Sequence, residues 1–93
     1  MGDAGERVRI EIVDILVRGE CPSGHTVGQT WEITDGMLPE GMCGSAYNSI
    51  QPFVTALRYG GAFPWSGERH LRVSCPDADN PVVFSVSVVE ERA

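Results

Sequence analysis

The residues best suited to chemistry in this 93-residue chain are its three cysteines and one of its two histidines. Cys21 and His25 enclose the segment Cys-Pro-Ser-Gly-His, in which Pro22 and Gly24 favour a tight turn around the sulfur. Such a turn directs backbone N–H groups at a thiolate, and zinc knuckles place a second ligand at its end. The spacing therefore indicates Cys21 and His25 as a pair of metal ligands.

Cys43 and Cys75 are the other two predicted ligands. Cys43 lies in a Gly-rich segment just before a predicted helix, whose positive N-terminal end would favour a thiolate. Cys75 ends a predicted strand and precedes a proline. Because all four residues fall at the ends of elements, loops can bring them to one point. We expect a Cys3His site that holds zinc, chiefly in a structural role, since mixed sulfur and nitrogen ligands in a tetrahedron suit this ion.

The same residues leave other interpretations open. Three unrelated cysteines buried in a core would produce the same composition. A thiol redox protein, or iron or an iron–sulfur cluster in place of zinc, would also use cysteine. A small metalloenzyme would leave one metal position open for a small organic substrate, with Arg58 or Tyr59 as candidate catalytic groups. The sequence contains no carboxylate pair or Ser-His-Asp arrangement that would define a reaction.

A second candidate site follows the predicted helix, where residues 58–65 read Arg-Tyr-Gly-Gly-Ala-Phe-Pro-Trp. The favoured interpretation is a helix stop followed by a loop that aromatic side chains hold in place. The alternative is a ligand pocket, for which the glycines would form the floor and aromatic rings the walls. The possible pocket residues are Tyr47, Tyr59, Gly60, Gly61, Phe63 and Trp65.

Four segments with the pattern of strands and one with the pattern of a helix must position these residues. The strand pattern covers 8–18, with a slip at Val13-Asp14 that indicates a bulge, and then 27–34, 70–75 and 82–89. The helix should begin after Ser45 as N-cap and end at Gly60-Gly61, with a kink at Pro52 or a break near Ile50. The order strand, strand, helix, strand, strand predicts one α+β domain over residues 8–93, in which a kinked helix packs on a four-stranded, mainly antiparallel sheet. Residues 1–7 are predicted to be a flexible N-terminus.

Composition restricts the partners. The formal charge is −6, and the seven basic residues, all arginine, are scattered, so the chain lacks the basic face that nucleic acids or anionic membranes require. No apolar run approaches the roughly 20 residues that span a bilayer. The first residues are acidic, unlike an export signal, and we expect a cytoplasmic protein with an unknown small molecule or protein as partner. A core this small would gain stability from a bound metal.

The motifs taken together resemble a family of short, uncharacterised bacterial proteins of about this length. The resemblance rests on the segments at 21–25, 38–43, 56–61, 63–65, 75–77 and 80–84, which read CPSGH, LPEGMC, ALRYGG, FPW, CPD and NPVVF. Cys21, His25, Cys43 and Cys75 match positions of the family's signature. The resemblance therefore implies a shared site for these four residues, and it implies no particular activity.

Overall fold

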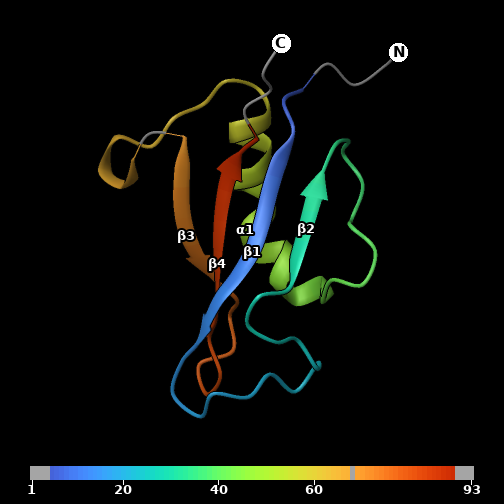
Figure 1. Cartoon of the computed structure of the whole chain (residues 1–93), viewed down its shortest axis with the longest axis vertical. Helices are drawn as coiled ribbons and strands as arrows, with labels where there is room; N and C mark the ends of the chain where they lie inside the picture. Colours follow the sequence, from blue (N-terminus) through green and yellow to red (C-terminus); the bar gives the residue numbers. More distant parts are fainter. Residues whose placement is uncertain (1–4, 68, 90–93) are drawn as a thin grey trace.

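The period-two segments form a four-stranded antiparallel sheet, and the apolar stripe forms the single helix that packs against it (Figure 1). The computed structural model describes residues 5–67 and 69–89. The elements are β1 (Val8–Ile15), β2 (Thr30–Ile33), α1 (Gly44–Arg58), a 3-10 turn (Pro64–Ser66), β3 (His70–Ser74) and β4 (Val82–Val88). The spatial strand order is β2-β1-β4-β3, with every neighbouring pair antiparallel. The predicted α+β fold is confirmed.

Both strands of the first hairpin are shorter than predicted. The register of β1 against β4 shifts between Ile12 and Asp14, which confirms the predicted bulge. β1 then ends at Ile15, because Val17 has the left-handed φ of 61° and the chain leaves the sheet. β2 begins only at Thr30, since Gly28 also adopts a positive φ of 97°. The loop between the two strands is therefore longer than the sequence pattern indicates.

α1 begins at Gly44, so the N-cap is Cys43 and the predicted Ser45 N-cap is wrong. The helix also continues through Pro52, so the predicted break near Ile50 is wrong. A proline inside a helix costs about 3 kcal/mol. Fully burying a side chain such as Ile50 or Val54 contributes about 1.5–3 kcal/mol, and these two, one on each side of the proline, are both buried against the sheet. Their burial offsets the cost of the proline.

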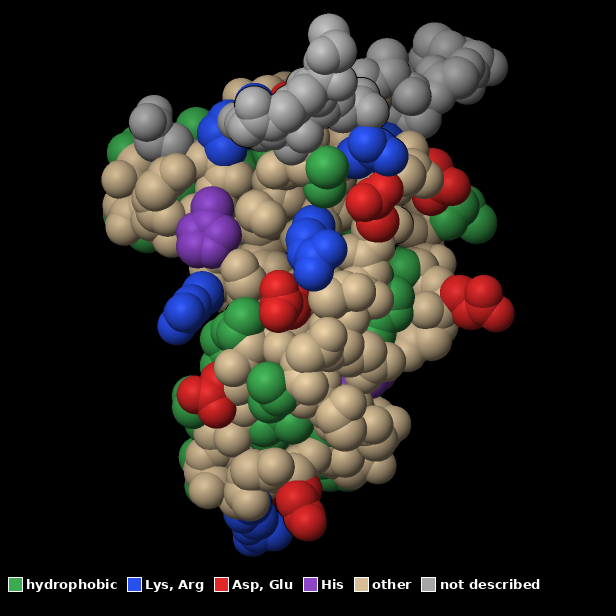
Figure 2. All heavy atoms as spheres, viewed as in Figure 1, with side chains coloured by type: hydrophobic (Ala, Val, Ile, Leu, Met, Phe, Trp, Pro, Cys, Tyr) green, Lys and Arg blue, Asp and Glu red, His purple; other side chains and the backbone are tan. Residues whose placement is uncertain are grey.

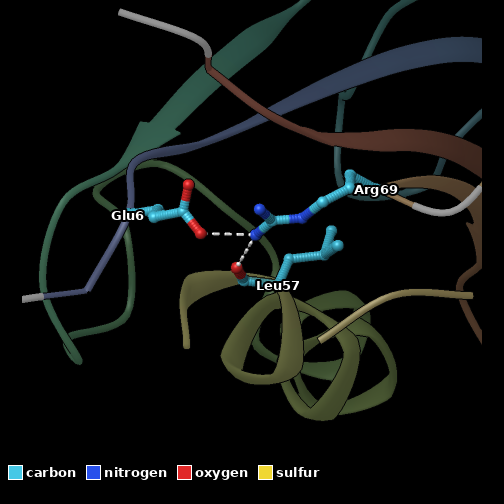
Figure 3. Close-up of polar contacts among 3 residues, drawn as sticks. All are labelled: Glu6, Leu57 and Arg69. Atoms are coloured by element: carbon cyan, nitrogen blue, oxygen red, sulfur yellow. Dashed lines mark hydrogen bonds and ion pairs between the residues drawn. The ribbon is translucent and has the colours of Figure 1, made fainter. Parts of the chain in front are cut away.

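Arg69 connects the N-terminal segment to the C-terminal end of α1 (Figure 3). Its guanidinium donates to the backbone carbonyl of Leu57 at 2.9 Å and pairs with the carboxylate of Glu6 at 2.5 Å. A positive charge at the end of a helix interacts favourably with the helix dipole. Glu6, one of the seven residues of the predicted flexible N-terminus, thus makes a defined contact, whereas residues 1–4 lie outside the described residues.

One face of the sheet is covered by α1, and Figure 2 shows the opposite side of the molecule. Acidic and basic side chains are interspersed there rather than gathered by sign. Arg7 pairs with Glu32 and Arg9 with Glu11, at 3.2 and 3.7 Å. Within the described part of the chain, no helix has the length and apolar character that a membrane crossing requires.

Candidate functional site: a cavity lined by three cysteines

The connections at one end of the sheet, the lower end in Figure 1, line a cavity of about 290 Å³. Three parts of the chain meet here, namely the β1–β2 loop, the N-terminal end of α1 and the β3–β4 hairpin. The cavity is lined by Cys21, Pro22, Ser23, His25, Cys43, Ser45, Ala46, Cys75, Pro76, Asp77, Asn80, Val82 and Phe84.

The four predicted metal ligands, Cys21, His25, Cys43 and Cys75, all line this cavity. The fold thus brings together four residues that are up to 54 positions apart in the sequence (75 minus 21). All three cysteines are free and partly buried. Across residues 5–67 and 69–89, however, no group of three or more His, Cys, Asp or Glu side chains is arranged so that it could hold a metal ion.

Cys43 occupies the N-cap of α1, where the environment favours its thiolate. The pKa of the Cys43 thiol is lowered, chiefly by the backbone N–H of Ala46 and next by the Ser23 hydroxyl. Partial burial raises the pKa and so opposes them, whereas Ser45 lowers it by a smaller amount. The Cys43 side chain makes no capping hydrogen bond in the structure. Because the pKa is lowered, the surrounding groups stabilise the thiolate more than the neutral thiol. Thiolates at helix N-termini are the reactive form of cysteine.

Cys75 is held differently, by the β3–β4 hairpin. The backbone N–H of Val82 donates to its sulfur at 3.3 Å, and the thiol faces the backbone carbonyl of Asn80 at 3.8 Å. Cys21 begins the predicted tight turn, which is confirmed by a hydrogen bond from the Gly24 N–H to the Cys21 carbonyl at 2.9 Å. The three thiols therefore share one cavity but have three different local environments.

His25 links the β1–β2 loop to the start of α1. The backbone N–H of Cys43 donates to His25 Nε2 at 3.0 Å, and His25 Nδ1 lies 3.2 Å from the Gln29 amide oxygen. Because an N–H can only donate and a carbonyl oxygen can only accept, the ring must be the neutral tautomer with its proton on Nδ1. Both ring nitrogens are thus engaged in hydrogen bonds, and the buried ring also packs nearly perpendicular to the Trp31 ring, with the ring centroids 5.3 Å apart. Metal ligation by His25 requires one of these bonds to break.

Asn80 is a site residue that the sequence analysis did not single out. The carboxylate of Asp77 accepts the backbone N–H groups of Asp79 and Asn80 at 2.9 and 3.2 Å, and this turn places Asn80 against the cavity. Asn80 is only 7% exposed, and its side-chain oxygen has no hydrogen-bond partner within the described residues. The Asp-Ala-Asp-Asn sequence indicated a turn, but no local pattern reports where a turn's side chains point.

The segment at 58–65 does not join this cavity. Tyr47 and Phe63 are buried in the core, whereas Tyr59 and Trp65 are 62% and 76% exposed. The two glycines end the helix: Gly60 has a φ of 90°, and the Gly61 N–H donates to the Ala56 carbonyl at 2.7 Å. These features support the interpretation of the segment as a helix stop.

Arg58 and Tyr59 also lie away from the cysteines. Arg58 is buried, donates to the Thr34 carbonyl at 3.3 Å and places its guanidinium over the Tyr59 ring. Cys43 and Arg58 are at opposite ends of α1, which has 15 residues and is therefore about 22 Å long. The structure thus places these two candidate catalytic residues far from the predicted metal ligands.

In comparisons with known proteins, no family profile, no curated protein and no solved structure matches the chain. The family resemblance stays a prediction.

Proposed function

We propose that this protein is a small thiol redox protein in which Cys43 is the nucleophile. The observation that supports the proposal most directly is that Cys43, favoured as a thiolate at the N-cap of α1, shares a cavity with two further free cysteines. A nucleophilic thiolate beside a second thiol is the minimum that disulfide exchange needs. A substrate disulfide of the form R–S–S–R supplies the oxidising equivalents.

The reaction proceeds in two exchange steps. The Cys43 thiolate attacks one sulfur of the substrate, which forms a mixed disulfide with Cys43 and releases the first R–S⁻. A second protein thiolate then attacks the Cys43 sulfur, which forms an internal disulfide and releases the second R–S⁻. Two protein thiols have then lost two electrons and two protons, and the substrate disulfide has gained them as two thiols.

Cys21 is our choice for the second thiol. Its turn interacts with Cys43 at two points, through the Ser23 hydroxyl near the sulfur and through His25, which accepts the Cys43 N–H. Cys75 belongs to a different connection and its sulfur accepts the Val82 N–H, which holds it in the hairpin.

Three serine variants test the proposal. Wild-type protein is treated with a small disulfide, and the adducts and internal disulfides are mapped by mass spectrometry. Cys43→Ser should form no mixed disulfide, Cys21→Ser should stop at a stable adduct on Cys43, and Cys75→Ser should behave as the wild type. Equal modification of the three thiols in the wild type would refute the role of Cys43. An internal disulfide between Cys43 and Cys75 would refute the role of Cys21.

A second candidate function is the metal-binding domain predicted from the sequence, with zinc, iron or an iron–sulfur cluster. It is favoured by the convergence of Cys21, His25, Cys43 and Cys75 on one cavity. The three thiols suit a thiophilic metal, but His25 uses both ring nitrogens in hydrogen bonds, so the metal would rely on the cysteines unless the ring is released.

Elemental analysis of protein purified without chelator tests this candidate. About one equivalent of metal per chain in the wild type would support it, if Cys43→Ser loses both the metal and thermal stability. The two losses should occur together, because the unfolded chain has no such site and the free energy of metal binding therefore adds to the free energy of folding. Metal-free protein with the disulfide chemistry described above would favour the thiol redox function. In either case we propose a cytoplasmic location, since a reducing compartment preserves the three free cysteines.

A further inference from the structure

The loop between β1 and β2, residues 16–29, exposes apolar side chains beside the cavity lined by the cysteines. Figure 1 shows this loop at the lower end of the molecule, where it projects beyond the sheet. Of the seven large hydrophobic side chains that are exposed among the described residues, three lie in it, namely Leu16, Val17 and Val27. Apolar side chains that gather on a surface, rather than lying singly, are typical of interaction sites.

A second hollow, of about 570 Å³, lies along the same loop and adjoins the cavity. Four residues line both of them, namely Cys21, Pro22, His25 and Asn80. The wall of the second hollow also includes Ile15, Arg18 and Val27. Because Leu16 and Val17 connect two of these wall residues, they lie near the same hollow as Val27. We call Leu16, Val17 and Val27 the docking surface.

The backbone of Val17 is strained in a way that favours a role for its side chain in binding. Val17 has a φ of 61°, in the left-handed region, which is costly for a side chain branched at Cβ. The residue is 77% exposed, so packing within the chain does not offset that cost. Glycine adopts such a φ freely, as Gly19 does at 77° two residues later. Burial of the valine against a partner would supply the stabilisation that the isolated chain lacks.

The extent and the charge of this region favour a polypeptide as the partner. A small disulfide would occupy the cavity of about 290 Å³ and leave the second hollow and the docking surface uncovered. An extended polypeptide segment advances about 3.3 Å per residue, so a few residues cover both hollows. Glu20 and Asp77 are among the lining residues, against Arg18, and the chain has a formal charge of −6. An acidic segment would therefore be repelled.

We infer that the substrate of the proposed redox site is a disulfide within a neutral or basic polypeptide segment, whose aliphatic side chains bind the docking surface while its disulfide meets Cys43. The Cys43 thiolate forms a bond to one sulfur of that disulfide, the disulfide breaks, and the other sulfur leaves as a thiolate. Leu16, Val17 and Val27 are then specificity-determining residues that position the segment and take no part in the exchange. The inference rests on the proposed function for the covalent step, whereas binding of the segment is independent of it.

The test compares two short peptides, each with a lysine at either end and a central cysteine joined by a disulfide to mercaptoethanol. Leucine and valine flank the cysteine in the apolar peptide, and serine flanks it in the polar peptide. The rate at which Cys43 forms an adduct with each peptide is divided by the rate of the same peptide with glutathione, which corrects for intrinsic reactivity. The wild type should prefer the apolar peptide by about tenfold, which corresponds to roughly 60 Å² of apolar surface removed from water.

Val17→Gly and Val27→Ser should each reduce this preference by about threefold, because each removes part of the apolar contact. Met37→Ser is the matched control and should retain the preference, since Met37 is 70% exposed and lines neither hollow. Val17→Gly also relieves the strained φ, so its melting temperature should equal or exceed that of the wild type. Equal corrected rates for the two peptides in the wild type, or an unchanged preference in both loop variants, would overturn the inference. A preference lost only together with a lower melting temperature would overturn it too.

A non-covalent measurement separates failure of the inference from failure of the proposed function. The apolar peptide is made with serine in place of its cysteine and with a fluorophore, and its binding is followed by anisotropy. If Cys43 reacts with no disulfide but this peptide binds the wild type and binds Val17→Gly more weakly, the redox function is wrong and the docking surface stands. If Cys43 reacts equally with both disulfide peptides and the serine peptide does not bind, the docking surface is wrong. A wild-type dimer in sedimentation that Val17→Gly dissociates would place a second copy on this surface and would also overturn the inference.

Discussion

Replacing His25 by leucine tests whether this residue holds the β1–β2 loop to α1. The substitution retains a buried side chain of similar size but removes the acceptor of the Cys43 N–H. An unsatisfied buried donor costs about 1–3 kcal/mol. Because Cys43 is only partly buried, we expect the lower part of this range, about 1–2 kcal/mol. For a domain of this size the melting temperature should fall by about 4–16 °C.

Thermal unfolding followed by circular dichroism, in buffer with a chelator, measures the loss. His70→Leu is the matched control, because His70 is exposed and its one described hydrogen bond is to the Ser85 hydroxyl; its effect should stay within about 0.5 kcal/mol. Equal melting temperatures for the two variants in chelator would refute the reasoning. A loss that occurs only in metal-loaded protein would identify His25 as a metal ligand rather than a structural link.

Three further predictions concern the ends of α1. Gly61→Ala should destabilise the protein by about 1–3 kcal/mol in urea unfolding, because the new Cβ would lie 2.7 Å from the Ala56 carbonyl oxygen; a near-zero change would show that the loop can move away. The wild type should gain stability over Cys43→Ser as the pH rises, because the pKa of the Cys43 thiol is lowered in the folded state. The stabilisation by the thiolate is fully present above the unfolded-state pKa near 9.0, and it is lost as the pH falls through the folded-state pKa. A difference independent of pH between 6 and 9 would contradict the thiolate. Arg69→Ala should cost about 1 kcal/mol in thermal unfolding through its lost hydrogen bond to the Leu57 carbonyl, and no loss would show that water replaces the guanidinium there.

The amino-acid sequence alone determined the elements and much of the site's membership. The alternation in residues 8–15 and 82–88 requires strands with one buried face, and the stripe of Ile50, Val54 and Leu57 requires a helix. Such patterns are readable because burial repeats with the period of the local backbone. Placement of the cysteines at element ends likewise made their meeting at one end of the sheet predictable, and all three line the cavity.

Tertiary structure decided which atoms of the converging segments meet at the cavity. Only packing could show that Pro52 lies within an unbroken helix, because the burial of neighbouring residues outweighs a local cost. The helix start at Gly44 made Cys43 the N-cap, and the loop register placed the His25 ring on the Cys43 N–H. Whether a histidine serves as a ligand or a hydrogen-bond acceptor depends on a separation of a few ångströms between segments distant in sequence. Residue types and spacings specify which segments can approach each other, but the atoms that finally meet depend on packing throughout the core.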